Sequence, residues 1–249
     1  MTTRRDFLKT MTMASAGLAL GTGDLLGAPI SVSQRKAAAD KVKIAYVGIG
    51  NRGEQIIGDF ARTGMVEVVA LCDVDMGAPH TQKVMNMYPK AKRFRDFRQM
   101  FDKAGNDFDA VAIATPDHSH FPITMLALAS GKHVYVEKPL ARTFYEAELL
   151  MQAALKRPNL VTQVGNQGHS EANYFQFKAW MDAGIIKDVT AVTAHMNNPR
   201  RWHGWDSGIY KLPSGQQLPN DMDWDTWLGV VPYHEYNNCL LYTSDAADE

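Results

Sequence analysis

A glycine-rich turn between an apolar run and a helical stretch constrains the fold more than any other feature of this chain. Residues 42–53 read VKIAYVGIGNRG, with three glycines at G-x-G-x-x-G spacing. In such a turn Gly48 permits a tight strand-to-helix connection, Gly50 lets the backbone approach a pyrophosphate, and Gly53 lets the helix pack closely on its strand. The helix that follows presents free N–H groups and the positive end of its dipole to the phosphates. The spacing therefore predicts a dinucleotide-binding turn, whose cofactor contacts would be Gly48, Gly50, Asn51, Arg52 and Gly53.

A second apolar run ends at Asp73, twenty residues beyond Gly53. A carboxylate at this distance accepts hydrogen bonds from the adenosine ribose hydroxyls, and it would repel a phosphate group at the same place. Glycines at this spacing occur by chance in many loops, but the preceding strand, the following helix and the acid together form a specific pattern. The sequence therefore predicts NAD as the cofactor, in preference to NADP.

Strand and helix patterns alternate along the chain as far as residue 164. Short, mostly apolar runs of the kind found in buried parallel strands lie at 43–47, 66–72, 110–114, 133–136 and 160–164, and 93–94 would add a brief strand. Helical patterns lie between them at 52–63, 79–88, 97–103, 123–130 and 144–156. Two of these begin with capping-box pairs, Asp96 with Gln99 and Thr143 with Glu146. The alternation predicts an α/β fold with a doubly wound parallel sheet.

The pattern then changes. A helix over 171–182 is stopped by Gly184, the run 188–196 alternates like a half-buried strand, and 197–219 is irregular and rich in Arg, Trp, Gly and Pro. This predicts a second domain of α+β type that is incomplete. We therefore expect a nucleotide-binding domain over 40–164 and the start of a substrate domain over 165–238.

The first residues carry a twin-arginine export pattern, TRRDFLK at residues 3–9. The weakly apolar stretch behind it, residues 11–20, is too short and too polar to span a bilayer. Twin-arginine export carries folded proteins, which suits an enzyme that takes up a dinucleotide in the cytoplasm. The sequence predicts a signal and linker over residues 1–39, no integral membrane segment, and a periplasmic or other extracytoplasmic location. A fortuitously basic N-terminus is the alternative.

The last residues, 239–249, read CLLYTSDAADE and resemble the translated read-through of a common sequencing-library adapter. This predicts a non-native tail, so that the natural protein would continue beyond Asn238 in another sequence. An ordinary acidic tail is the alternative.

Composition argues against several classes of function. The formal net charge over 249 residues is -1, which gives no electrostatic reason to expect nucleic acid as a partner. Cys72 and Cys239 are the only cysteines, so a disulfide framework is excluded in practice, and Cys72 is expected to be buried because it ends an apolar run. His118 and His120 form an H-x-H pair without a third ligand nearby, so no metal site is predicted.

Two polar segments directly follow strands, where ligands bind in open parallel sheets. TPDHSH, residues 115–120, follows one strand, and EKP, residues 137–139, follows the next. Pro139 fixes the backbone beside Lys138, so this lysine is predicted to face the cofactor crevice. A solvated lysine beside a turn is the alternative. The two histidines of the first segment would cap the following helix or cover the sheet edge.

The glycine turn, Asp73, TPDHSH and EKP, in this order and at these distances, resemble the Gfo/Idh/MocA family of NAD(P)-dependent oxidoreductases, in particular its exported, twin-arginine-bearing branch. QVGNQGHS at 163–170 and GIIK at 184–187 also fit, so the likeness covers about residues 42–238. It implies a Rossmann domain followed by a domain built on an open, mostly antiparallel sheet. It also implies oxidation or reduction of hydroxyl and keto groups on sugars, inositols and related polyols. We expect a homo-oligomer for the full-length protein.

The resemblance further implies roles for single residues. Lys138 matches the family's catalytic lysine. Positions around the nicotinamide are matched by Thr115, Pro116, His118, His120 and Glu137, and Gln167 is a further expected cofactor contact. The family's D-x-x-x-H pair from the second domain has no counterpart here, which implies a C-terminally truncated chain that is inactive by itself. Candidate substrate contacts are His169, Arg201 and Trp202, with packing of the second domain as the alternative for the aromatic residues.

The residue chemistry leaves more than one function open. As a hydride leaves a carbinol carbon for nicotinamide, another group must take up or polarise the hydroxyl proton. Lys138 could act as the base, or stay charged and stabilise the developing alkoxide. The leading hypothesis is an NAD-dependent dehydrogenase of a sugar or polyol. The alternatives are an NAD-dependent glycosidase, which oxidises a sugar transiently and eliminates the glycosidic group, and a non-catalytic NAD-binding module.

Overall fold

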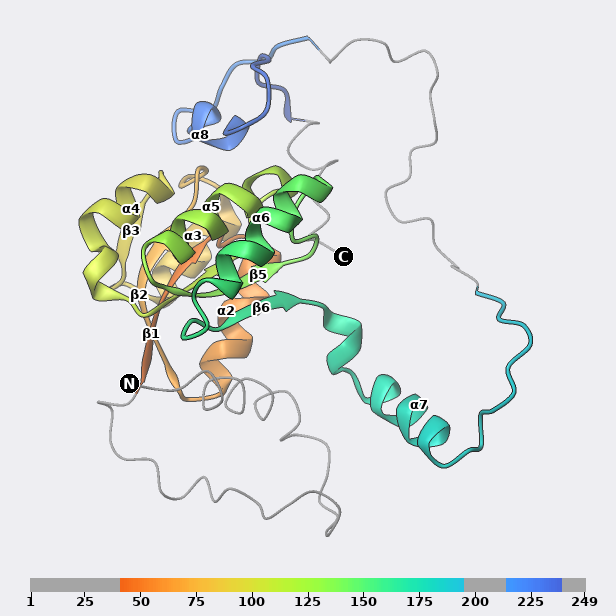
Figure 1. Ribbon diagram of the computed structural model, residues 1–249. Helices are drawn as coiled ribbons and strands as arrows, with labels where there is room; N and C mark the ends of the chain where they lie inside the picture. Colours follow the sequence, from red (N-terminus) through yellow and green to blue (C-terminus); the bar gives the residue numbers. More distant parts are fainter. Residues whose placement is uncertain (1–40, 195–213, 239–249) are drawn as a thin grey trace.

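The computed structural model describes residues 41–194 and 214–238, and within them six strands form one parallel sheet (Figure 1). The sheet order is β3-β2-β1-β4-β5-β6, and every neighbouring pair is parallel. The strands are β1 Val42–Val47, β2 Val66–Cys72, β3 Lys92–Phe94, β4 Ala110–Ile113, β5 His133–Glu137 and β6 Thr162–Gly165. The chain order reverses between β1 and β4, which is the doubly wound arrangement whose crevice binds ligands. The predicted α/β fold class is confirmed for this sheet.

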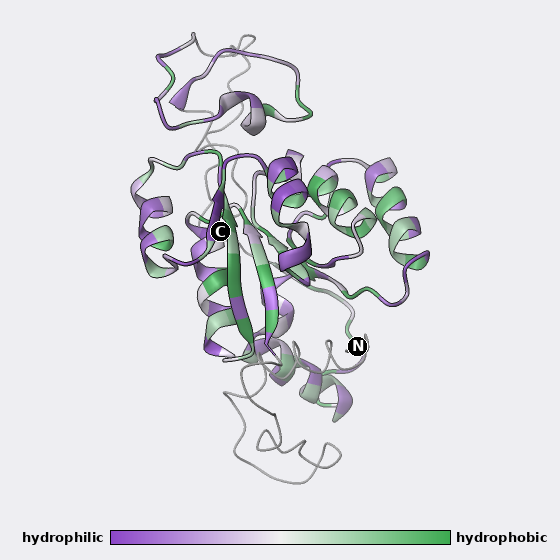
Figure 2. Ribbon diagram, turned by 90° about the vertical axis from the view of Figure 1, so that its left-hand side faces the viewer, coloured by the Kyte–Doolittle hydropathy of each residue, from purple (hydrophilic) through white to green (hydrophobic). Residues whose placement is uncertain are grey.

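Helices lie on both faces of the sheet (Figure 2). They are α2 Arg52–Arg62, α3 Pro79–Met87, α4 Phe97–Ala104, α5 Asp117–Ala129 and α6 Phe144–Leu155, followed by α7 Ala172–Asp182 and α8 Trp224–Leu228, with short 3-10 turns η3 Gly105–Asp107 and η4 Gln167–Ser170. Alternate residues of β1 point to opposite faces, so Ile44 and Tyr46 join the core under α2 and α3, and Ala45 and Val47 join the core under α4, α5 and α6. Because both faces are buried, the strands read as unbroken apolar runs.

The predicted elements before residue 183 lie within two residues of their observed bounds, with one exception. The helix predicted at 123–130 begins earlier, at Asp117. Proline is rare inside helices, so Pro122 suggested a start after it. In the structure Pro122 lies inside α5, and the first turn is held by burial of Ser119 and His120 and by a 2.9 Å bond from Ser119 N to Pro116 O. The TPDHSH segment is therefore the first turn of a helix.

Of the two predicted capping boxes, one forms in full and the other is replaced by a different cap. Thr143 and Glu146 form the predicted capping box of α6. At α4 the Asp96 side chain instead accepts a 2.8 Å hydrogen bond from Arg98 N. Cys72 is buried as expected, and burial raises the pKa of its thiol.

The strand predicted at 188–196 is wrong for the residues that the structure describes. Residues 188–194 form no strand, and Val189 and Val192 are 55% and 83% exposed. Alternating polar and apolar residues form a strand only where a neighbouring strand pairs with them, and no segment within 41–194 and 214–238 does so. The pattern alone was not sufficient.

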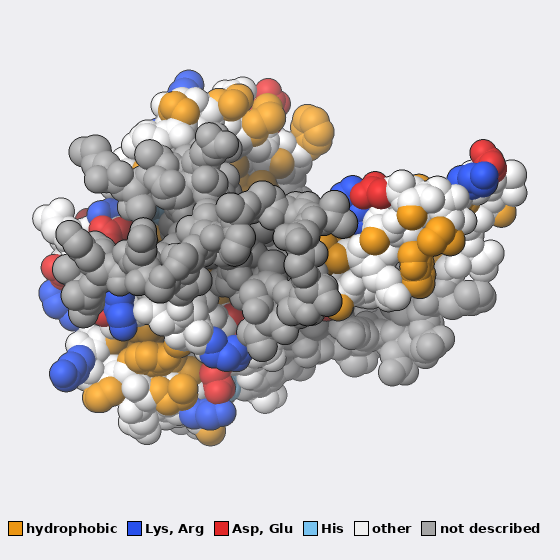
Figure 3. Space-filling view, turned by 90° about the horizontal axis from the view of Figure 1, so that it is seen from below, with side chains coloured by type: hydrophobic (Ala, Val, Ile, Leu, Met, Phe, Trp, Pro, Cys, Tyr) orange, Lys and Arg blue, Asp and Glu red, His pale blue; other side chains and the backbone are white. Residues whose placement is uncertain are grey.

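Helix α7 projects from the sheet on an arm that begins after β6 (Figures 1 and 3). None of its residues is buried. Its exposed apolar side chains include Tyr174, Phe175, Phe177, Trp180 and Met181. Within the described parts of the chain, this helix is therefore not covered by another element.

Residues 214–238, which we call the cap, lie over the carboxyl ends of the strands (Figure 1). Met222 forms an antiparallel bridge with Asp75, and Asp223 N donates to Val74 O at 2.8 Å. The cap has its own apolar cluster of Met222, Trp224, Trp227, Leu228 and Tyr236, in which the two indoles stack with centroids 4.5 Å apart. The sequence did not anticipate this contact with the nucleotide-binding edge.

Candidate cofactor site

The glycine turn between β1 and α2 is as tight as its spacing predicts. Gly48 has φ +77, and a Cβ there would lie 2.4 Å from Ala114 O at the end of β4. A Cβ on Gly53 would lie 2.1 Å from Gly48 O. The positive φ of Gly48, and contacts this short with backbone atoms at both positions, exclude other side chains there. The structural roles expected of Gly48 and Gly53 are confirmed.

The middle glycine has a neighbour that sequence reasoning missed. His80, the second residue of α3, places its ring over Gly50, so that a Cβ on Gly50 would lie 2.2 Å from His80 Cδ2. Both residues line the same cleft. The position of His80 in the first turn of the helix that follows Asp73 could have indicated this contact. A pyrophosphate approaching Gly50 would therefore meet an imidazole as well as backbone.

Asp73 connects the end of β2 to this turn. Its Oδ2 accepts a 2.9 Å hydrogen bond from Ile49 N, and its Oδ1 accepts one of 3.0 Å from Asp75 N. Burial raises the pKa of the Asp73 carboxyl, and these two backbone bonds and nearby His80 oppose the shift. The carboxylate is thus held at the rim of the cleft, where the predicted ribose contact would be made.

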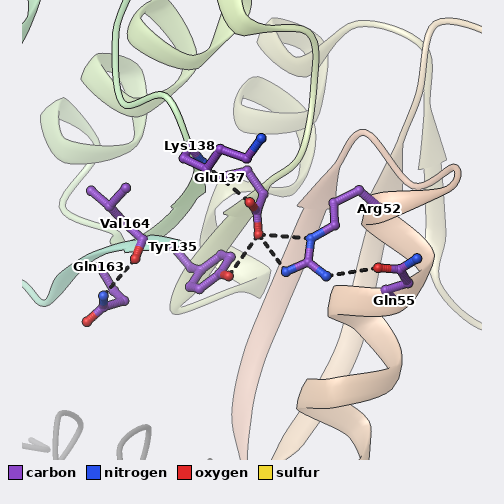
Figure 4. A network of polar contacts seen from close by, with 7 residues as sticks. All are labelled: Arg52, Gln55, Tyr135, Glu137, Lys138, Gln163 and Val164. Atoms are coloured by element: carbon purple, nitrogen blue, oxygen red, sulfur yellow. Dashed lines mark hydrogen bonds and ion pairs between the residues drawn. The ribbon is translucent and has the colours of Figure 1, made fainter. Parts of the chain in front are cut away.

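Glu137 of the EKP segment is the centre of a buried network (Figure 4). Its side chain is 0% exposed, and its Oε1 accepts from Arg52 Nε at 3.2 Å, Arg52 Nη2 at 2.9 Å and Tyr135 OH at 2.9 Å. Gln55 receives a further bond from Arg52 Nη1 at 2.9 Å. Burial, followed by the Glu137 charge, raises the pKa of the Tyr135 hydroxyl. Arg52 and Glu137 therefore join the glycine turn to β5, and their contact with the cofactor stays a prediction.

Lys138 is half-buried, and its amine lies outside that network (Figure 4). Asp117, the first residue of α5, lies near enough for the Lys138 charge to affect it. Burial raises the pKa of the Asp117 carboxyl, while His120, Lys138 and His118 oppose the shift. Asp117 Oδ1 is buried and has no hydrogen-bond partner among the described residues. Asp117 is therefore a further candidate site residue, for which the TPDHSH motif alone did not indicate a role.

The two histidines of TPDHSH have separate tasks. His120 is fully buried, with Nδ1 2.7 Å from Pro139 O and Nε2 2.7 Å from Thr115 O, so it joins the TPDHSH and EKP segments. His118 Nε2 lies 2.6 Å from Trp227 O of the cap, and burial lowers the pKa of the imidazole. No group of three or more His, Cys, Asp or Glu side chains in residues 41–194 and 214–238 could hold a metal ion.

One cleft runs along the carboxyl edge of the sheet, between the glycine turn and the cap. It has a volume of about 890 Å³ including its open mouth, and it is lined by Gly48, Gly50 and Asn51, by Asp73, Val74 and Asp75, by Thr115 and Pro116, and by Met222, Thr226 and Trp227 of the cap. Thr115 Oγ1 is buried without a hydrogen-bond partner among the described residues. A glycine turn, a rim carboxylate and an unsatisfied hydroxyl are the groups that a dinucleotide requires, so the cleft fits one.

The other candidate residues do not line this cleft, among them Arg52, Gly53, His118, His120, Glu137 and Lys138. Gln167 lies in η4, and the His169 ring contacts Tyr174, with centroids 5.2 Å apart. Arg201 and Trp202 lie outside the described residues, as does the export signal. The cofactor contact of Gln167 and the substrate contacts of His169, Arg201 and Trp202 stay predictions.

Comparison with known proteins identifies the domain. The family model described as the Gfo/Idh/MocA oxidoreductase family, NAD-binding Rossmann fold, matches residues 42–165. This chain carries the NAD-binding domain of the Gfo/Idh/MocA oxidoreductases. The resemblance to this family, inferred from the glycine turn, Asp73, TPDHSH and EKP, is confirmed for residues 42–165, and NAD is the cofactor of this domain. The resemblance to the exported branch stays a prediction.

Relatives of this Gfo/Idh/MocA chain include two kinds of enzyme. Inositol 2-dehydrogenase from Salmonella typhimurium is 28% identical over 191 residues, which cover 75% of this chain and 54% of that protein. A glycosyl hydrolase family 109 protein from Shewanella pealeana is 31% identical over 167 residues, covering 61% and 36%. Another, protein 2 of a Shewanella species, is 27% identical over an alignment that covers 94% of this chain and 55% of that protein. The chain thus spans about half the length, or less, of the relatives it matches.

A solved structure supports the same fold. Scyllo-inositol dehydrogenase from Lactobacillus casei, with bound NAD(H) and scyllo-inositol, has a TM-score of 0.54 and 29% identity, covering 60% of this chain and 43% of that chain. Myo-inositol 2-dehydrogenase from Lactobacillus plantarum has a TM-score of 0.53 and 25% identity, covering 60% and 43%.

Proposed function

We propose that this protein is an NAD-dependent oxidoreductase that transfers a hydride between a sugar or polyol hydroxyl and nicotinamide. The observation that carries the proposal is that Lys138 follows β5 and Asp117 follows β4, at the same carboxyl edge of the sheet as the glycine turn and Asp73, with Lys138 near enough to affect the pKa of Asp117. The similarity to inositol dehydrogenases supports a polyol as the substrate class.

In the proposed reaction, bound NAD would supply the hydride acceptor. The hydroxyl proton of the substrate would pass to Lys138 Nζ if the amine is neutral, or the charged amine would stabilise the alkoxide oxygen by hydrogen bonding. Asp117 would position the amine electrostatically. His120 would fix the distance between this pair and Thr115, because it contacts both Pro139 O and Thr115 O.

A second candidate is an NAD-dependent glycosidase, in which the sugar is oxidised, the glycosidic group is eliminated and the hydride is returned. Its support is the likeness to glycosyl hydrolase family 109 proteins, one of which covers 94% of this chain. A non-catalytic NAD-binding module is the least favoured, because it would give no reason for Lys138 beside Asp117.

We also propose export by the twin-arginine route and assembly into a homo-oligomer. The support for export is the TRRDFLK motif. Within the described ranges, no helix has the length and apolar character needed to cross a bilayer. A fusion of residues 1–39 to a folded reporter would test export, with both arginines replaced by lysine as the control. Loss of export in the control is expected, and export that survives it would contradict the proposal.

The function is tested with a panel of inositols, sugars and chromogenic glycosides. NADH formation with a polyol supports the dehydrogenase, and aglycone release without net NADH supports the glycosidase. Lys138→Met should lower turnover by about 10²–10⁴-fold and leave NAD binding unchanged. Lys103→Met, on the exposed face of α4, is the matched control. Wild-type turnover in the Lys138 variant would exclude this lysine from the reaction.

A further inference from the structure

Arg95 lies beside Asp73 at the rim where the adenosine ribose would bind. It follows β3, whose Phe94 pairs with Cys72, and Asp73 N donates to Phe94 O at 3.0 Å. Arg95 lines the same cleft as Asp73 and Asp75. An arginine in this place is the group that NADP-binding Rossmann domains use to hold the 2′-phosphate. The rim therefore combines an acid that suits NAD with a cation that would suit NADP.

The cap supplies the partner of this cation. Asp221 Oδ1 lies 3.0 Å from Arg95 Nη2, and the two side chains are 63% and 45% exposed. An ion pair this exposed contributes little to folding stability. The ion pair matters instead for ligand binding. Asp221 accepts a hydrogen bond from an Arg95 N–H group, and this group is then less available to a cofactor at the ribose rim.

The backbone fixes Asp221 in this position. Met76 N donates to Asp221 O at 3.2 Å, and the next residue, Met222, bridges to Asp75. Gly77 leaves the necessary room, since a Cβ there would lie 2.8 Å from Asp221 Cβ. The carboxylate is therefore placed by the loop that follows β2, and not only by its attraction to Arg95.

From these contacts we propose that Asp221 is a second determinant of NAD specificity, acting together with Asp73. Asp221 does not itself line the cleft, but it offsets the charge of Arg95, which lines the cleft together with Asp73 and Asp75 where a 2′-phosphate would have to enter. The extra phosphate of NADP would be repelled by Asp73 and Asp75 and would find Arg95 already paired with Asp221, whereas NAD carries only a hydroxyl there. The proposal rests on the proposed function, since it concerns the same cofactor cleft.

Titrations of the full 249-residue chain with NADH and NADPH, followed by nicotinamide fluorescence, test this proposal. D221N should tighten NADPH binding by about fivefold or more and change NADH binding by less than about twofold, because Arg95 is released from its ion pair. D221S should do the same. The double variant R95A/D221N should lose most of the gain. D225N removes an exposed acid of the cap for which no ion pair with Arg95 is found, so it is the matched control and should leave both affinities unchanged.

The possible failures are distinguishable. If the parent chain binds neither nucleotide, the proposed function is overturned together with this inference. If the parent binds NADH and D73N alters the ratio of the two affinities, but D221N and D221S leave it unchanged, only the role of Asp221 is overturned. A gain in D221N that persists in R95A/D221N would also contradict the proposal, because it would not act through Arg95.

Discussion

The Arg52 guanidinium donates to one carboxylate oxygen of Glu137 through Nε and Nη2, at 3.2 and 2.9 Å, and so joins the first turn of α2 to the end of β5. The two side chains are 10% and 0% exposed. Glu137 immediately precedes Lys138, and Arg52 lies within the glycine turn. The position of the cofactor turn is thereby coupled to that of the candidate catalytic lysine.

Removal of one partner of this pair should destabilise the protein strongly. R52A leaves the Glu137 carboxylate buried without its cationic partner, with the Tyr135 hydroxyl and a long 3.4 Å bond from Lys138 N still donating to it, and this typically costs about 3–5 kcal/mol. The measurement is the free energy of unfolding in urea. R62A is the matched control on the same helix, since its ion pair with Asp59 is exposed and should contribute at most about 1 kcal/mol. Equal effects of R52A and R62A would show that the buried pair has no special role.

Two glycines of α2 should respond to alanine in opposite ways. In G53A the new Cβ would lie 2.1 Å from Gly48 O, so the turn must open, and we expect a loss of NAD affinity of at least about tenfold. In G58A the nearest atom would be Arg62 Nη1 at 3.8 Å, and a helical Gly→Ala change without a clash should stabilise by about 0.5–1 kcal/mol. Calorimetric NAD titration and thermal unfolding of both variants are the measurements. Wild-type affinity in G53A would contradict the tight-turn role.

The sheet was predictable because its signals are local. Apolar runs identify strands that are buried on both faces, and the glycine spacing identifies a tight turn at the carboxyl edge, which the structure shows at Gly48 and Gly53. The capping box at Thr143 was equally visible, because its partners lie three residues apart.

What the sequence did not reveal depends on contacts between distant segments. His118 meets Trp227 across 109 residues, and Arg52 meets Glu137 across 85. The residue types at these positions fit either a contact with the cofactor or a structural contact within the protein, and only the fold distinguishes the two. The error at 188–196 has the same origin, since strand formation there depends on a partner that the pattern itself does not contain.

His118 should make stability depend on pH. Burial is the largest cause of its lowered pKa, and Arg142 and His120 add to the shift, while the Trp227 carbonyl and Asp117 oppose it. As the pH falls through the ordinary value of 6.5, the unfolded chain gains a proton at this residue before the folded chain does. Stability is therefore present above that pH and is lost below it, until the folded form is protonated as well.

H118Q should consequently flatten the fall in unfolding free energy between about pH 7 and pH 5. His133 is the comparison, because burial lowers its pKa too, and it receives a hydrogen bond at Nδ1 from Val161 N, away from the cap. H133Q should remove a separate part of the pH dependence of the unfolding free energy, and the double variant should remove both parts. A slope in H118Q identical to that of the parent would show that His118 is not responsible.

Trp227 should report cofactor binding, because its indole lines the cleft at the cap. Trp224 stacks on it with centroids 4.5 Å apart, but Trp224 does not line the cleft. NAD added to the parent should therefore change the tryptophan emission, and W227F should lose most of this change. W224F, which removes the stacked neighbour, should keep it. The measurement is a fluorescence titration of the parent and both variants, with NAD affinity determined independently by calorimetry. If W227F binds NAD and retains the full emission change, the cap does not lie against the bound cofactor.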